Sequence, residues 1–204
     1  MKTKKLGGLF LALVLLAGAF LILPVHGEAG VYDSVIRLHV LANSDSEEDQ
    51  ALKLTVRDAV LEKTEELLAG VETREEAEEI LRKSLSEIEA AAARALTENG
   101  CADGVSVTLS REKYPRRTYE GLAFPAGNYL SLQVKIGKAE GHNWWCVLFP
   151  PMCLSAAACD REAVCLSAGL TEEQYRLITE SDGGKYKLRF KILEVAEELL
   201  GAGE

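Results

Sequence analysis

The spacing of apolar residues changes near residue 100 of this chain, and that change limits the folds it can adopt. Between residues 45 and 98, apolar side chains recur every three or four positions, as they do in an amphipathic helix. From residue 105 to residue 136 they alternate with polar ones, as in a strand with one buried face. Two helices joined by a short loop form a hairpin, and strands joined by short turns form a meander. We therefore expect an α+β fold of two layers, with an antiparallel sheet meander packed by the helical hairpin and by C-terminal helices.

Residues with capping chemistry mark the starts of the two long helices. Ser44 with Glu47 matches a capping box, and so does Thr73 with Glu76. The predicted helices occupy four ranges: 45–68, 73–98, 171–179 and 187–200. The start of the last one is ambiguous, because residues 186–190 alternate as a strand does.

Five strands are predicted, at 35–41, 105–110, 118–123, 130–136 and 144–149. The last of them is continuously apolar, which favours a central strand that is covered on both faces. Pro150 and Pro151 then end the sheet region. Residues 152–169 are poorly patterned, and we expect a loop with some helix there.

The N-terminus has the pattern of an export signal. Lysines at positions 2, 4 and 5 precede an apolar run over residues 6–25. Gly27 is the first choice for a cleavage point and Ala29 the second. The run is close to the roughly 20 residues that span a bilayer, so an uncleaved anchor is the alternative. We predict a signal peptide or membrane anchor over residues 1–29 and a single domain over residues 30–204.

The charge of the chain restricts its partners. The formal net charge is -9, which repels nucleic acid and anionic lipid over most of the surface. Residues 114–119, Y-P-R-R-T-Y, are a basic and aromatic exception. They are interpreted as a loop between strands, or as a surface that meets an acidic partner or membrane headgroups. We expect no nucleic acid, small-molecule substrate, metal or cofactor.

Five cysteines leave three states open. Cys101, Cys146, Cys153, Cys159 and Cys165 are an odd number, so complete pairing within one chain is excluded. Free or partly paired thiols, one or two disulfides, and a zinc site are the alternatives, although the tight pairs of structural zinc sites are absent from the sequence.

Two stretches differ from ordinary scaffold, residues 39–58 and 141–151, because they combine turn residues with many polar side chains. The acidic residues near position 45 are interpreted as cap and helix-dipole residues rather than as cation ligands. Lys53 and Arg57 share a helix face, either exposed to solvent or contacting the sheet or a partner. The candidate partner-binding residues are His39, Asn43, Asp45, Asp49, Gln50, Lys53, Arg57, Asp58, His142, Asn143, Trp144 and Trp145.

Adjacent tryptophans in a strand point to opposite faces, so Trp144 and Trp145 cannot serve the same surface. Both could be core residues, or one could anchor a partner. A second hypothesis concerns chemistry: if His39 and His142 met at one sheet edge beside Cys146, they would form the minimum of a thiol enzyme. Asn43 or Asn143 would then orient the base. The alternative for His142 and Asn143 is ordinary hydrogen bonding in a tight turn.

These stretches resemble the stage II sporulation protein R family. The resemblance lies in V-I-R-L-H-V-L-A-N-S-D-S from residue 35, F-P-A-G-N-Y at 124–129 and G-H-N-W-W-C-V-L-F-P-P at 141–151. It covers roughly residues 35–151, and motifs of this length are specific.

The resemblance implies an exported, non-enzymatic signal that is made in the forespore. It would enter the space between forespore and mother cell and activate a membrane-embedded aspartic protease, which processes the precursor of an early mother-cell sigma factor. It implies no catalytic residues. An extracytoplasmic thiol- or His-dependent hydrolase is the alternative function, and an envelope-binding module is a third.

Overall fold

The computed structural model describes residues 26–119, 122–153 and 161–180. Residues 1–25 of the export segment predicted over 1–29, the last predicted helix and Cys159 lie outside these described residues. No helix within the described ranges has the length and apolarity that crossing a membrane requires.

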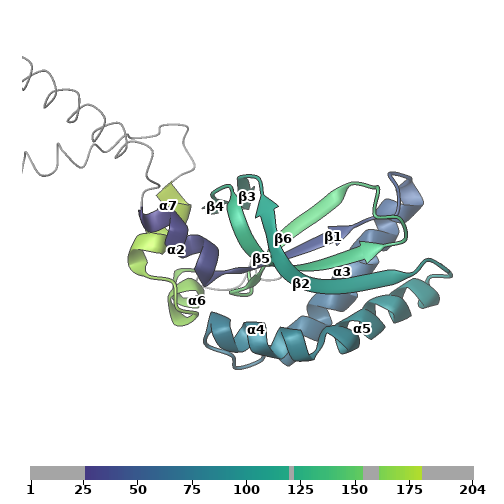
Figure 1. Ribbon diagram of the computed structural model, residues 1–204, viewed down its shortest axis with the longest axis horizontal. Helices are drawn as coiled ribbons and strands as arrows, with labels where there is room; N and C mark the ends of the chain where they lie inside the picture. Colours follow the sequence, from purple (N-terminus) through teal and green to yellow (C-terminus); the bar gives the residue numbers. More distant parts are fainter. Residues whose placement is uncertain (1–25, 120–121, 154–160, 181–204) are drawn as a thin grey trace, which may run out of the picture.

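A four-stranded sheet forms one layer of the molecule (Figure 1). Its strands are β1 (Ile36–Leu41), β2 (Val105–Tyr114), β5 (Gly127–Ile136) and β6 (Asn143–Phe149), in the order β2-β5-β1-β6. β2 pairs antiparallel with β5, and β6 pairs antiparallel with β1. The predicted α+β class is confirmed.

The strand order differs from the predicted meander. β1 lies between β5 and β6 and runs parallel to β5. β5 and β6 follow each other in the sequence but are therefore not neighbours in the sheet. The physical reason is burial: β1 is buried along almost its whole length, which suits an inner position. The apolar strand predicted to be central, β6, lies at the edge of the four-stranded sheet instead.

Three helices cover one face of the sheet (Figure 1): α3 (Glu47–Leu67), α4 (Arg74–Lys83) and α5 (Leu85–Glu98). Apolar side chains of α3 and α5, including Val56, Val60 and Ile88, pack with Leu38 and Val134 of the sheet in one core. Each fully buried side chain of this size contributes about 1.5–3 kcal/mol to folding, so this layer is the main source of stability.

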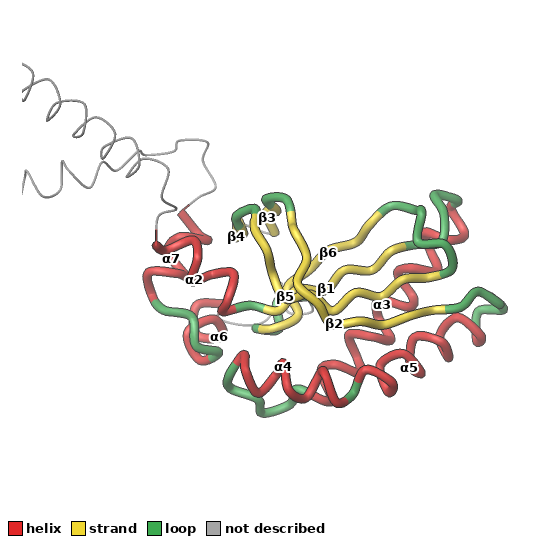
Figure 2. The backbone as a smooth tube through the Cα atoms, in the orientation of Figure 1, coloured by secondary structure: helices red, strands yellow, loops and turns green. Residues whose placement is uncertain are grey.

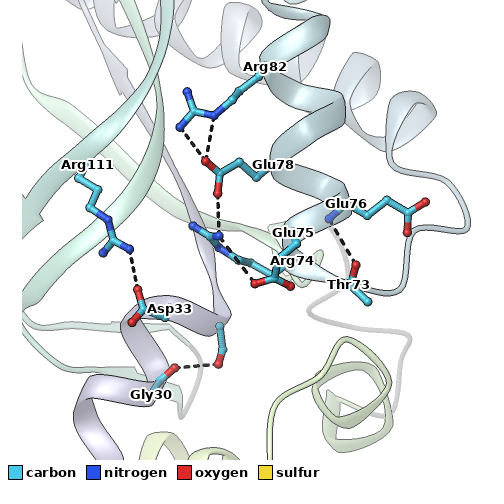
Figure 3. A network of polar contacts seen from close by, with 10 residues as sticks. Gly30, Asp33, Thr73, Arg74, Glu75, Glu76, Glu78, Arg82 and Arg111 are labelled. Carbon is cyan, nitrogen blue, oxygen red and sulfur yellow. Dashed lines mark hydrogen bonds and ion pairs between the residues drawn. The ribbon is translucent and has the colours of Figure 1, made fainter.

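Two details of the predicted helices are wrong. The N-cap of α3 is Ser46 and not Ser44: the Ser46 hydroxyl accepts the Asp49 N–H at 3.1 Å. The predicted helix over 73–98 is divided at Ser84, which leaves helical geometry with φ −104° and ψ 10°. Its predicted start is confirmed, because the Thr73 hydroxyl accepts the Glu76 N–H at 3.3 Å (Figure 3).

A second, smaller core lies at one end of the other sheet face. It is formed by α2 (His26–Ser34), α6 (Arg161–Ser167), α7 (Glu172–Glu180) and a hairpin of β3 (Arg117–Tyr119) and β4 (Leu122–Phe124). Figure 2 shows the hairpin toward the end of the sheet that carries α2 and α7. The sequence did not predict α2. An exposed ion pair of 2.7 Å between Asp33 of α2 and Arg111 of β2 also connects these two elements (Figure 3).

Candidate partner-binding site

The two unusual stretches of the sequence meet where β1 leaves the sheet. The loop that follows β1 and the turn between β5 and β6 lie against each other, and α3 begins beside them. Glu140 and Gly141 donate backbone hydrogen bonds to the carbonyls of Asn43 and Ala42, at 3.2 and 3.0 Å. Gly141 is required by this close approach, because a Cβ there would collide with the Ser44 carbonyl.

Polar side chains complete this contact, and we call them the loop cluster: Asn43, Ser44, Asp45, Asp49, Gln50, Lys53 and His142. Asn43 donates to the Asp49 carboxylate at 3.0 Å and accepts the Lys138 N–H at 3.0 Å. The Ser44 hydroxyl also donates to Asp49. These hydrogen bonds lower the pKa of Asp49, with the bond from Ser44 as the largest cause, so the Asp49 carboxylate is charged at neutral pH.

Lys53 joins α3 to the turn. Its ammonium is buried and donates to Gln50 Oε1 at 2.6 Å and to the His142 carbonyl at 2.9 Å. Burial lowers the pKa of Lys53, and the nearby charge of Asp45 opposes that shift. Asp45 in turn accepts the backbone N–H of His142 and contacts its ring. The loop cluster therefore holds the two stretches together, and of the alternatives for Lys53 the structure shows a contact with the turn before β6 rather than exposure to solvent.

The remaining helix candidates lie on the helical side of the sheet. Arg57 places its guanidinium carbon 4.9 Å from the Trp144 ring centroid and donates to Asp58 at 2.7 Å. Trp144 packs against the main core, whereas Trp145 belongs to the smaller core. The prediction that the two indoles serve opposite faces is confirmed, and both are half-buried.

His39 and Trp145 form a stack on the other face of the sheet. Their rings lie 5.2 Å apart at 28°. The nitrogens of the buried His39 ring contact Glu112 Oε1 at 2.8 Å and Asn143 Oδ1 at 2.9 Å. Arg117 of the hairpin lies over the Trp145 ring, with its guanidinium carbon 3.9 Å from the centroid. We call these residues the His39 stack: His39, Glu112, Arg117, Asn143 and Trp145.

Beside the stack, Arg37 is completely buried in an aromatic cage. Its guanidinium carbon lies 4.5–5.4 Å from the ring centroids of Tyr114, Tyr119, Phe124 and Tyr129. Nε donates to the Cys146 carbonyl at 3.0 Å and Nη2 to the Tyr119 hydroxyl at 2.7 Å, whereas Nη1 has no acceptor among the residues that the structure describes. Arg37 thus ties β1 to β6 and to the hairpin.

The geometry contradicts the proposed thiol site. Cys146 is bonded to Cys153 in a disulfide, with their Cα atoms 5.8 Å apart. It is also paired with Leu38 in the sheet register, so its side chain lies on the face opposite His39. His142 contacts Asp45 and His39 contacts Glu112, so the two imidazoles have separate partners. Of the described cysteines, Cys101 and Cys165 are free, and no group of three metal-ligating side chains occurs in the described ranges.

A comparison with known families decides what kind of chain this is. The model of the stage II sporulation protein R family matches residues 32–158, which contain the loop cluster, the His39 stack and the Arg37 cage. The chain belongs to the stage II sporulation protein R family.

A curated member of that family supports the assignment. The stage II sporulation protein R of Bacillus subtilis (strain 168) is 40% identical over 121 residues, which are 59% of this chain. The match spans about half, 54%, of the length of that relative. No solved structure matches this chain significantly.

Sequence reasoning missed four residues of this family member's candidate site: Arg37, Glu112, Arg117 and Tyr119. Arg37 carried a signal, because it shares the polar face of its strand with His39. Arg117 and Tyr119 lay within the basic aromatic patch at 114–119, which was noticed without being connected to His39. Glu112 had no distinguishing neighbour in the sequence.

Proposed function

We propose that this chain is an intercellular sporulation signal that is exported from the forespore. In the space between forespore and mother cell, it activates a membrane-embedded aspartic protease of the mother cell. The activated protease then processes the precursor of an early mother-cell sigma factor.

The observation that carries this proposal is the family match over residues 32–158, because it includes both unusual stretches and the sheet face between them. The N-terminal sequence supports it independently, since three lysines followed by an apolar run suit export across a membrane. If this segment is cleaved, the signal is a free domain; if it is retained, the domain is tethered to the membrane that it crossed.

The described side chains suit a binding role. The polar groups of the loop cluster are engaged with one another and with backbone groups, so they stabilise the domain. The His39 stack instead offers a half-buried indole and a guanidinium near the surface, and Trp and Arg are the residues most often found at the energetic centres of protein interfaces. We therefore place the protease contact on the sheet face that carries this stack.

Deleting the gene in its spore-forming host tests the proposal. Cells without it should accumulate the uncut sigma-factor precursor during sporulation, as measured by immunoblotting. A gene that encodes residues 26–204 without an export signal should fail to restore processing, because the signal would stay on the wrong side of the membrane. Normal processing in the deletion strain would reject the proposed function.

A further inference from the structure

Arg117 is held in place by a series of contacts that begins in the sheet. Glu112 and Asn143 fix the His39 ring, His39 stacks on Trp145, and Trp145 carries the guanidinium of Arg117 at 3.9 Å. Because a guanidinium is planar, this contact sets the direction in which its N–H groups point. The side chain is therefore oriented before any partner binds.

The oriented guanidinium has no acceptor of its own. Arg117 Nε is buried without a hydrogen-bond partner, and Arg117 forms no ion pair with any acidic side chain in the described ranges. Nη1 of the fully buried Arg37 also lacks a hydrogen-bond partner among the described residues. Buried donors without acceptors are uncommon in native proteins, and each one needs an explanation such as strain or a missing water, ion or ligand.

Tyr119 interacts with both arginines and does not neutralise their positive charges. It accepts a hydrogen bond from Arg37, and the charges of both Arg37 and Arg117 act on its hydroxyl. Burial nevertheless raises the pKa of Tyr119, so it is a neutral phenol at neutral pH and supplies no countercharge to the two arginines.

The chain segment that supplies β2, β3, β4 and β5 is also basic on balance. Residues 105–138 contain six basic and two acidic side chains, whereas residues 45–98, which form the helical layer, contain seven basic and 16 acidic ones. Arg116, which precedes Arg117 in the chain, is exposed. An acidic segment would thus be attracted to this face and repelled by the helical layer.

We propose that Arg117, oriented by Trp145 and His39, is a receptor for a carboxylate side chain in an acidic segment of the partner protein. This inference rests on the proposed function and adds where the partner binds and which chemistry it presents. A carboxylate matches the fixed, planar N–H groups of a guanidinium in two parallel hydrogen bonds. A membrane surface would require only positive charge, and its headgroups would not need an oriented donor.

An activation assay with charge reversals tests the inference. The full chain is produced together with the candidate protease and its tagged substrate, and cleavage is measured. Arg117→Glu should reduce cleavage by at least about tenfold, because it places like charges at the contact. The matched control is Arg94→Glu, an identical change at an exposed position of α5. With this control, the protease should cleave its substrate as it does with the wild type. Equal cleavage by Arg117→Glu and wild type would overturn the inference and leave the proposed function intact.

The conservative variant separates the guanidinium from its charge. Arg117→Lys retains the positive charge but loses the planar set of donors and the flat contact with Trp145. We expect cleavage between that of the wild type and that of Arg117→Glu. If the protease cleaves its substrate equally well with Arg117→Lys and with the wild type, positive charge alone is sufficient. That result would contradict a receptor that depends on an oriented guanidinium.

A binding measurement keeps the inference testable even if the wild type does not activate the protease. A ten-residue peptide of alternating Glu and Ser is titrated into the full chain, and the NMR signal of the Arg117 Nε–H group is followed. The Glu peptide should shift this signal, and the matching Gln peptide should not. Absence of a shift overturns the inference, and so does a shift produced only by anionic phosphatidylglycerol vesicles, which would identify a lipid surface instead.

Discussion

At the scale of single residues, Arg37 explains how the sheet face is organised. A buried cation is costly unless its donors are used, and here a carbonyl, a hydroxyl and four aromatic rings take the place of water. Since those groups come from β2, β3, β4, β5 and β6, one side chain of β1 joins elements that are far apart in the sequence.

Replacing Arg37 tests this role. Arg37→Ala should lower the free energy of unfolding by about 3 kcal/mol, because it leaves a cavity and removes the partner of two buried polar groups. Arg37→Met should lose less, because it fills most of the volume. Urea denaturation measures both, and an Arg37→Ala midpoint equal to that of the wild type would contradict the structural role.

The tyrosines of the cage predict an alkaline transition. Burial raises the pKa of Tyr114 and of Tyr119 above their ordinary value of 10.0. A phenol with a raised folded-state pKa stabilises the protein fully below pH 10 and loses that contribution as the pH rises through the folded-state pKa. Phenolate absorbance should therefore show late-titrating tyrosines whose ionisation accompanies unfolding, and Tyr119→Phe should remove one of them. Ionisation of every tyrosine near pH 10 without unfolding would refute the buried cage.

The sequence predicted part of this site. His39, Asn143 and Trp145 were recognised because strand alternation and turn residues are local signals. The burial of Arg37 was not predictable in the same way, since a charged residue on the polar face of a strand is normally exposed. It is buried by a hairpin whose Tyr119 lies 82 residues further along the chain.

At the scale of elements, local pattern predicted the helices better than it predicted their partners. α3, α7 and the four sheet strands lie close to their predicted ranges, because hydrophobic period and capping residues are encoded locally. The pairing of β1 with β5 joins segments more than 90 residues apart, and no local pattern specifies it. The apolar run in β6 similarly indicated burial but not position within the sheet.

The disulfide gives a prediction at this scale. It ties the inner face of β6 to the segment that follows Pro151 and closes a short loop of sequence separation 7. Loop-closure entropy for so short a loop is about 2–3 kcal/mol, so Cys146→Ser with Cys153→Ser should lower stability by about that amount. Mass spectrometry of a non-reduced digest should find the peptides containing these two cysteines joined, and two separate, freely alkylated peptides would disprove the bond.

Retention of signalling in the double variant is a separate expectation. The cysteines lie on the helical side of the sheet, away from the His39 stack. Substrate cleavage by the activated protease should persist at temperatures where the variant remains folded. Complete loss of activity in a folded variant would reopen a chemical role for Cys146.

At the scale of the whole molecule, charge and architecture coincide. The acidic helices form one layer, and the basic strand segments and the hairpin belong to the other (Figure 1). α2, where the described chain begins, packs with α7 at the same end as the hairpin (Figure 2).

Reconstitution in lipid vesicles tests whether this protein is the activating signal. The candidate protease and the sigma-factor precursor are placed in lipid vesicles, and this chain is added outside, either complete or beginning at Glu28. We expect the precursor to be cut only when the chain is present, and the protease to cut it far less with Arg117→Glu than with Arg94→Glu. Cleavage at the same rate without the chain, or no cleavage with either form of it, would contradict the proposal that this protein is the activating signal.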